Sequence, residues 1–180
     1  MRVPSSFNDV ILTTGPRPFH DHHSRAESRN LYAVTARIVS IQLCPGHREP
    51  MRLVPTATLI TGLGLEGDKH AVGASDRQVL LADKEALDAV DVQPGTIKEN
   101  LTVEGLNVME LPVGSRLHLG ASAVLEITKV CEPCFRMDEI RDGLRQELEG
   151  RRGMVSRVVL GGSIHVGDPI MVEEAKPLAS

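Results

Sequence analysis

The chain has 180 residues, 41% hydrophobic and 24% charged, a composition typical of one globular domain with its own core. With 2% aromatic residues and a net charge of −4, it lacks both the stacking platforms of a single-strand nucleic-acid binder and a basic surface for nucleic acid or an anionic membrane. No apolar run approaches the ~20 residues of a membrane span. Three cysteines are too few for a disulfide framework, and no signal peptide is recognisable, so we expect a cytoplasmic protein.

Residues 1–30 differ from the rest of the chain. They contain Pro16, Pro18 and a histidine-rich cluster at residues 20–23, and they show little periodicity. This pattern predicts a flexible or loosely docked tail. A histidine cluster can bind metal and a basic N-terminus can target an organelle, but a tail without function is the favoured interpretation. The folded domain is expected to cover residues 31–175.

Short strand patterns dominate the chain after the tail. Strands are predicted over residues 39–43, 56–61, 77–82, 101–103, 116–119, 123–130, 155–160 and 164–172. The fifth and sixth form a hairpin, and the last two form a pair. Asp83 can begin a short helix that runs to Ala89, and apolar residues at helical spacing predict a second helix over 137–149. Because strands and helices do not alternate, we predict a mostly β fold with peripheral α-helices, a closed or nearly closed β-barrel.

Gly62, Gly64 and Gly67 match the glycine spacing of the dinucleotide-binding fingerprint. That fingerprint needs a long helix whose N-terminus meets the pyrophosphate, and the residues that follow have no apolar helical period. We therefore interpret the segment as a loop with unusual backbone angles. Asp68 and His70 at its end are either solvated or line a site over which the loop folds.

Cys131 and Cys134 stand where a strand pattern gives way to a helix pattern. A thiol just before a helix is favoured as the thiolate, which attacks electrophiles and binds soft metals. A redox dithiol would call for a βαβ unit, but a hairpin precedes this segment. A structural zinc site would need further ligands, and only the scattered Cys44, His118 and His165 are available. A metal- or sulfur-carrying thiolate and a pair of buried packing cysteines remain open.

Two polar clusters complete the candidates. Residues 98–100 (KEN) precede a strand and are interpreted as a simple turn. Arg151, Arg152 and Arg157 form the densest positive group, which suits bidentate phosphate or carboxylate binding. A solvated helix end explains the first two arginines equally well.

Five segments, in this order and spacing, resemble a stand-alone MOSC domain, a family named for the C-terminal domain of molybdenum cofactor sulfurases. They are residues 64–70 (GLEGDKH), 77–79 (RQV), 99–105 (ENLTVEG), 131–134 (CEPC) and 157–162 (RVVLGG). The resemblance spans about residues 33–173. It implies a β-barrel fold of the MOSC and pyruvate-kinase-barrel type, consistent with the strand pattern, and binding of the pterin-based molybdenum cofactor (molybdopterin).

The resemblance also implies roles for residues near the cysteines. In the family's reductases the last cysteine before the chain leaves the strand ligates molybdenum, and that position is Cys134. Glu99 and Asn100 belong to the family's strand-leading cluster, whose asparagine would hold the pterin or its phosphate. The backbone around Glu132 and Pro133 would contact the pterin.

Four further positions enter through the same resemblance. Asp83 stands where the reductases carry a serine near the cofactor, and its charge would be unfavourable beside an anionic phosphate. Arg157 would help to anchor the cofactor. Asp68 or His70 would serve as a proton source near the substrate.

The resemblance implies a reductase of N-hydroxylated small molecules, akin to short bacterial members associated with detoxifying N-hydroxylated bases. The sequence carries no flavin, haem or iron–sulfur motif, so a partner protein would supply the electrons. One alternative is a sulfur carrier with a persulfide on Cys134, and another is a non-catalytic binding module. The substrate, the electron donor and the oligomeric state stay open.

Overall fold

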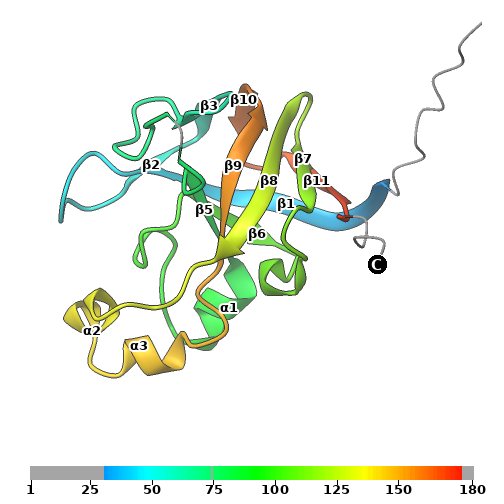
Figure 1. Cartoon of the computed structure of the whole chain (residues 1–180). Coiled ribbons are helices and arrows are strands. Elements are labelled where there is room, and N and C mark those ends of the chain that lie inside the picture. The colour runs from blue at the N-terminus through cyan, green and yellow to red at the C-terminus, as the bar shows by residue number, and fades with distance from the viewer. Residues whose placement is uncertain (1–30, 74, 176–180) are drawn as a thin grey trace, which may run out of the picture.

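The computed structural model describes residues 31–73 and 75–175, which form a β-rich fold with short helices at one end (Figure 1). The strands are β1 (Leu31–Leu43), β2 (Arg52–Val54), β3 (Thr56–Ile60), β4 (Gly64–Leu65), β5 (Val79–Asp83), β6 (Leu101–Glu104), β7 (Arg116–Leu119), β8 (Ala123–Val130), β9 (Met154–Leu160), β10 (Gly162–His165) and β11 (Pro169–Glu173). The helices are α1 (Lys84–Ala89), α2 (Arg136–Ile140), α3 (Leu144–Glu147) and the 3₁₀ turn η1 (Val108–Glu110).

Among the described strands, seven close into a barrel in the order β11-β7-β8-β9-β5-β6-β1, and β1 pairs with β11 to complete the ring. All of these neighbours are antiparallel except β5 and β6, which are parallel and are connected through α1. Closure leaves no open sheet edge in the ring. The predicted mostly β barrel with peripheral helices is therefore confirmed, as are the β7–β8 hairpin and α1.

A buried aliphatic cluster fills the barrel, with Ile38, Leu81, Leu101, Leu117 and Leu125 among its fully buried members. This is the core expected of a chain with so few aromatic residues. Aliphatic side chains pack at close to crystal density without polar atoms to satisfy. The barrel walls are consequently rigid supports for the loops at their ends.

In the strand predicted at residues 39–43, apolar residues alternate with Ser40 and Gln42, the pattern of a half-buried strand, but the structure does not expose these two polar residues. Both residues are buried, and Gln42 Nε2 donates to Ser40 Oγ at 2.8 Å and to Thr102 Oγ1 at 3.2 Å. The outer face of β1 is covered here by residues 95–100, whose Asn100 carbonyl accepts the Gln42 N–H at 2.8 Å. Polar and apolar residues alternate along a strand whether its polar face is solvated or covered by another segment, so the alternation alone cannot tell these two cases apart.

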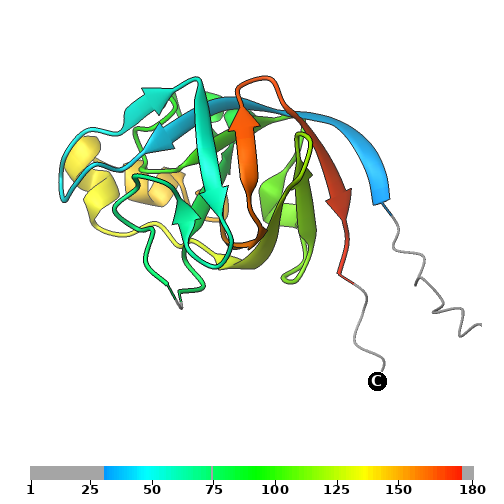
Figure 2. The ribbon, with the colours of Figure 1, turned by 90° about the horizontal axis from the view of Figure 1, so that it is seen from above.

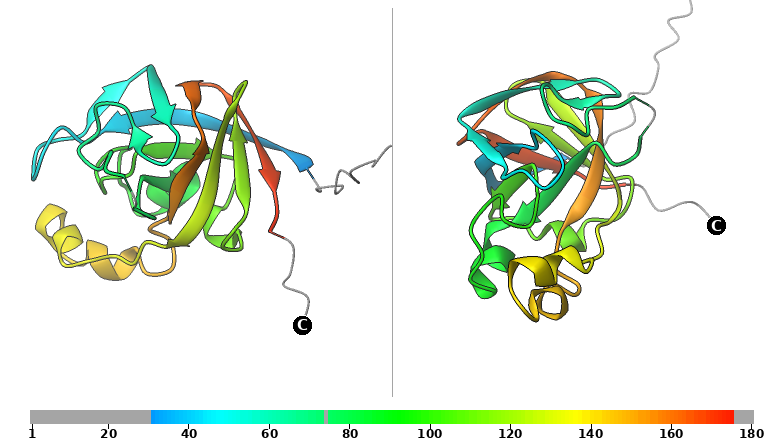
Figure 3. Two further views of the ribbon diagram at one scale, coloured as in Figure 1. Left: turned by 45° about the horizontal axis from the view of Figure 1, so that its top comes forward. Right: turned by 90° about the vertical axis from the view of Figure 1, so that its left-hand side faces the viewer.

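The single helix predicted over residues 137–149 is also wrong, because the chain breaks between α2 and α3. Arg141 is extended (φ −157°) and Gly143 is left-handed (φ +81°), conformations that no α-helix continues through. Met137 and Leu144 are still buried at one end of the barrel, beside α1 (Figure 3). The helical spacing of apolar residues therefore reported a shared buried face, not a continuous helix.

The last two predicted strands do not pair with each other. Residues 164–172 divide into β10 and β11, separated by a turn; β10 pairs with β3, while β11 returns to the barrel beside β7 (Figure 2). The transfer from β9 to β10 passes through Gly161, where a Cβ atom would lie 2.6 Å from the Leu59 carbonyl oxygen. Only glycine permits this close crossing into the small sheet β10-β3-β4.

Across residues 31–73 and 75–175, no helix has the length and apolar character needed to cross a membrane. The tail predicted over residues 1–30, with its histidine cluster, lies outside the described residues.

Candidate functional site

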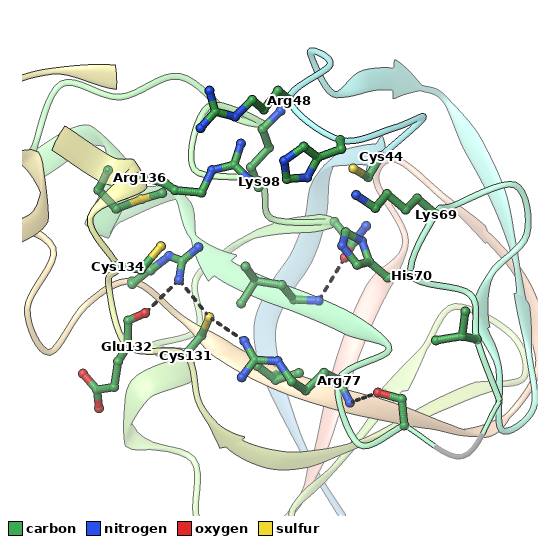
Figure 4. A pocket seen from close by; sticks show the side chains of 18 of the residues that line it. Cys44, Arg48, Lys69, His70, Arg77, Lys98, Cys131, Glu132, Cys134 and Arg136 are labelled. Carbon is green, nitrogen blue, oxygen red and sulfur yellow. Dashed lines mark hydrogen bonds between the residues drawn. The ribbon is translucent and has the colours of Figure 1, made fainter. Parts of the chain in front are cut away.

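A cavity of about 690 Å³ opens between one side of the barrel and α2, a volume typical of a small-molecule site. All three cysteines of the chain, Cys44, Cys131 and Cys134, line it (Figure 4). Cys44 follows β1 and the other two follow β8, so the barrel brings together thiols almost 90 residues apart. The three are free, not disulfide-bonded.

The turn after β8 makes its two cysteines unequal. Cys131 is 3% exposed, and its N–H donates to the Gly153 carbonyl at 3.0 Å, whereas Cys134 is only partly buried. Cys134 therefore has the more accessible thiol. The helix behind it, α2, has five residues, so the dipole that a long helix would have directed at this sulfur is correspondingly short.

Arg152 anchors this turn from beneath. Its Nη1 donates to Cys131 Sγ at 3.1 Å and to the Glu132 carbonyl at 2.8 Å, and its Nη2 donates to the Ile97 carbonyl at 3.4 Å. The residue is 9% exposed, so the solvated helix end proposed for this arginine is wrong, although neighbouring Arg151 is exposed. Its Nε has no hydrogen-bond partner among the described residues.

A second arginine reaches the same sulfur. Arg77 Nη2 lies 3.7 Å from Cys131 Sγ, from the segment that leads into β5. Arg77 is an exposed residue, whereas the guanidinium of Arg152 is buried and favours negative charge close by. Cys131 thus faces two cationic donors, which marks the floor of the cavity as a place for anionic groups.

Gly153 sets the position of Arg152 against the barrel. It has φ +128°, and a Cβ atom there would collide with the Leu81 carbonyl of β5. The chain can pass this close to the sheet only as glycine. This approach places the preceding arginine under the cysteine turn.

Asp68 organises the opposite side of the cavity. Its Oδ2 accepts the Cys44 N–H at 2.6 Å and the Asn100 Nδ2–H at 2.8 Å. Its Oδ1 accepts the His70 N–H at 2.7 Å and contacts His70 Nδ1 at 3.1 Å. Burial alone would raise the pKa of Asp68, but the hydrogen bonds from His70 and the Cys44 amide together lower it. Asp68 is thus a carboxylate that ties three segments together.

The contact with Asp68 orients the His70 ring. An ionised carboxylate only accepts, so Nδ1 of His70 carries the proton in this contact and Nε2 is the nitrogen left for other partners. The His70 side chain is 51% exposed and lines the cavity, whereas Asp68 lies beneath the surface. Of the two predicted proton sources, His70 has the access and Asp68 has the role of holding it.

Asn100 lines the cavity but is largely committed to the fold. Its Nδ2 donates to Asp68 and, at 3.2 Å, to the Gln42 carbonyl, and its Oδ1 accepts the Leu80 N–H at 3.1 Å. Both amide hydrogens are used, so a ligand would meet only the second lone pair of Oδ1. Residues 98–100 are thus no simple turn.

Glu99 is fully buried behind Asn100. Its Oε1 accepts the Gly95 N–H and, at 3.0 Å, the Thr102 hydroxyl, while its Oε2 has no partner among the described residues. Burial raises the pKa of Glu99. It does not line the cavity.

Pro133, Arg157 and Asp83 also lie outside the set of lining residues. Pro133 is buried within the cysteine turn. Arg157 pairs with Glu126 at 2.6 Å on the outer face of β9. Asp83 accepts the Val108 N–H at 3.3 Å, and burial raises its pKa to about 6.

Positive charge dominates the described residues that line the cavity. Six of them are cationic: Arg48, Lys69, Arg77, Lys98, Arg136 and Arg152. Glu132 is the one acidic side chain in the same set, although the whole chain carries −4. A cleft of one sign with apolar walls concentrates anionic ligands.

Sequence reasoning missed most of these cations. Lys69 and Arg77 lie in family segments, and Lys98 and Arg152 belong to the two polar clusters, but those signals did not place any of them in a shared cavity. Arg48 and Lys98 lie in turns 50 residues apart, and nothing in their local sequence shows that they face one cavity. Among the described residues, no group of three or more His, Cys, Asp or Glu side chains is arranged to hold a metal ion.

The fold and the cavity together define a small β-barrel protein with an anion-attracting, thiol-lined pocket. A model of the MOSC domain family matches residues 67–171, more than half of the chain, and the chain belongs to that family, which is associated with the molybdenum cofactor. No curated protein matches the chain.

Solved structures share the fold. The YuaD protein from Bacillus subtilis is similar over 81% of this chain and 100% of its own, with 20% identity and a TM-score of 0.70. YiiM from Geobacillus stearothermophilus is similar over 77% of this chain and 75% of its own (19% identity, TM-score 0.63). YiiM from Escherichia coli is similar over 80% of this chain and 72% of its own, with 21% identity and a TM-score of 0.58.

Proposed function

We propose that this MOSC protein binds the pterin-based molybdenum cofactor and reduces N-hydroxylated small molecules, with Cys134 as the thiolate ligand of the metal. The observation that carries the proposal is the partly exposed Cys134 thiol in a cavity lined by six cations and one acid. A single soft thiolate suits a metal whose other ligands come from its own cofactor.

The residues present fit such a cofactor. The cofactor is anionic through its phosphate and its sulfur ligands, and the cavity offers guanidinium and ammonium donors on several sides. The buried Nε of Arg152, which has no partner among the described residues, is a donor that a bound anion would satisfy. Arg152 and Arg77 would hold the anionic groups of the cofactor, and Asn100 Oδ1 would accept a hydrogen bond from one of its N–H groups.

The proposed reaction converts R–NHOH, two electrons and two protons into R–NH₂ and water. When bound, the cofactor supplies the two-electron chemistry. With a second proton on Nε2, His70 would deliver that proton to the leaving oxygen while Asp68 holds Nδ1–H. The electrons would come from a partner protein, as the sequence carries no redox motif of its own.

Metal content tests the ligand assignment. We would express the protein in a host that makes the cofactor and compare bound molybdenum in the wild type, Cys134→Ser and Cys44→Ser. The second variant is a matched control, because serine can keep the Cys44 hydrogen bond to the Gly46 carbonyl. Molybdenum should fall at least about tenfold in Cys134→Ser only, a loss of 1.4 kcal/mol or more in binding. Equal metal in all three would refute the assignment.

A second candidate, a sulfur carrier, is favoured by the pair of guanidinium donors at Cys131. In that function a pocket thiolate, proposed at Cys134, attacks the outer sulfur of a donor persulfide. A new S–S bond forms and the donor thiolate leaves. Arg152 and Arg77, which contact Cys131 Sγ, would add positive charge close to the negative persulfide on Cys134. Cyanide-labile sulfur after loading by a cysteine desulfurase, without bound molybdenum, would favour this function over the first.

A further inference from the structure

Three loop cations lie across the cavity from the cysteine floor. Arg48, Lys69 and Lys98 come from the turns after β1, after β4 and before β6, and Figure 4 shows them apart from Cys131 and Arg77. They are called here the loop cations. Arg77 and Arg152 already place positive charge beside Cys131, so the loop cations are not needed to stabilise a negative charge on that thiol.

Two of the loop cations occupy unfavourable backbone conformations. Arg48 has φ +64° and Lys98 has φ +70°, and Asp91 is the third non-glycine residue with positive φ among those described. Aspartate adopts this region readily, but arginine and lysine do not. Strain of this kind is retained where the side chain has a use. Here both strained side chains line the cavity.

The loop cations keep most of their charge available. Arg48 pairs with Glu139 at 3.4 Å, but its side chain is 64% exposed, so the pair is weak. Lys98 Nζ donates to the Glu49 carbonyl, which joins the two loops without neutralising the charge. The Lys69 side chain makes no hydrogen bond or ion pair with any described residue.

The cavity has little to hold a neutral heterocycle. None of the described residues that line it is Phe, Tyr or Trp, so the smaller rings of His47 and His70 are the aromatic surfaces that it offers a base. Charge-assisted hydrogen bonds are therefore the strongest contacts that it offers. A ligand with a phosphate would use them and a bare base would not.

From these features we infer that the loop cations bind the phosphate monoester of the substrate, so that the compound reduced in this pocket is an N-hydroxylated nucleotide and not a free base. This inference rests on the proposed function for the reaction, but the phosphate site is defined by the loop cations alone. Lys98 and Arg48 would contact the phosphate oxygens, and Lys69 would add long-range attraction.

Calorimetric binding to the full chain tests the site without any activity measurement. The probes are adenosine and cytidine 5′-monophosphates, the two nucleosides and inorganic phosphate, at low salt. The variants Arg48→Asn and Lys98→Asn remove charge, and asparagine tolerates positive φ, so their folds should be kept. Arg145→Gln, on the exposed surface of α3, is the control for net charge.

At least one nucleotide should bind tighter than its nucleoside and than inorganic phosphate. Its affinity should fall about 10- to 100-fold in Arg48→Asn and Lys98→Asn, the range for one lost charge-assisted bond, and should not change in Arg145→Gln. Equal binding of nucleotide and nucleoside, binding of neither nucleotide, or equal loss in Arg145→Gln would overturn the inference.

A second binding experiment distinguishes a phosphate of the substrate from the phosphate of the molybdenum cofactor. If protein loaded with the molybdenum cofactor still binds the nucleotide, the loop cations serve the substrate. If loading abolishes nucleotide binding, they hold the phosphate of the cofactor and the inference is wrong. Protein that binds nucleotide but no molybdenum would instead refute the proposed function and leave the phosphate site standing.

Discussion

Arg152 Nη1 lies 3.1 Å from Cys131 Sγ, and the same nitrogen holds the Glu132 carbonyl at 2.8 Å. One buried guanidinium thus determines both the charge beside one cysteine and the path of the turn that presents the other. Cys134 can be accessible because Cys131 and its arginine keep the base of the turn in place.

Replacing Arg152 should therefore destabilise the fold and loosen the turn. Arg152→Met leaves the Glu132 and Ile97 carbonyls without their donor, so we expect a loss of about 2–4 kcal/mol in the free energy of unfolding. Arg152→Lys should lose less than Arg152→Met because an ammonium still donates to part of this set, but it should lose something because one ammonium cannot reach all three acceptors. Urea denaturation measures this. The exposed neighbour supplies the control: Arg151→Lys should change little, and an equal effect there would contradict the structural role.

Asp68 should make stability depend on pH in the acid range. Its pKa is lowered in the folded protein, so its contribution is present above the ordinary value of 3.8 and lost as the pH falls through the lower folded value. At pH 7, Asp68→Asn should cost about 1–3 kcal/mol, since an amide cannot accept all of the N–H groups that the carboxylate accepts. Urea midpoints of the two proteins should converge towards pH 3. Exposed Asp76→Asn is the control, and parallel curves would argue against the network.

Asp83 should make the folded protein less stable as the pH rises, the opposite of the pH dependence expected from Asp68. Burial raises its pKa from 3.8 to about 6, so its favourable contribution is complete below pH 3.8 and is lost as the pH rises through about 6. Relative to Asp83→Asn, which stays neutral, the wild type should lose about 2–3 kcal/mol between pH 4 and pH 8. Thermal unfolding across this range measures the difference. Exposed Asp88→Asn, beside Lys84, should show no such slope, and a flat difference for Asp83 would refute its burial as an acid.

Glu99 should tolerate an amide but not truncation. Its Oε2 and Gln42 Oε1 are both buried and have no hydrogen-bond partner among residues 31–73 and 75–175, and burial raises the pKa of Glu99. A protonated acid or an amide brings a donor into this cluster, so Glu99→Gln should be at least as stable as the wild type at pH 7. Glu99→Ala should lose about 2–4 kcal/mol, because it leaves a cavity and unpaired Gly95 and Thr102 donors. Urea denaturation measures the free energy of unfolding of both variants. Equal losses in Glu99→Gln and Glu99→Ala would contradict this prediction and mean that Glu99 acts as a buried carboxylate.

The fold was more predictable than the site. Strand patterns and glycine turns predicted the barrel and the β7–β8 hairpin, because period-two burial and tight turns are local properties. The break between α2 and α3 and the separation of β10 from β11 were missed. Arg141 donates to the distant Val90 carbonyl at 2.8 Å, and Gly161 passes close to the Leu59 carbonyl, so both depend on partners elsewhere in the chain.

By itself the sequence determined the family segments, the barrel class and the position of the cysteine pair, and only the family resemblance pointed to Cys134. The tertiary structure alone decided which charges face Cys131 and how far each cysteine is exposed. Arg152 and Cys131 are 21 residues apart, and Asn100 and Asp68 are 32 apart. Whether an arginine is a solvated surface charge or a buried anchor depends on what covers it, and no local sequence encodes that cover. The two cysteines look equivalent in the printed chain, and the barrel makes them different.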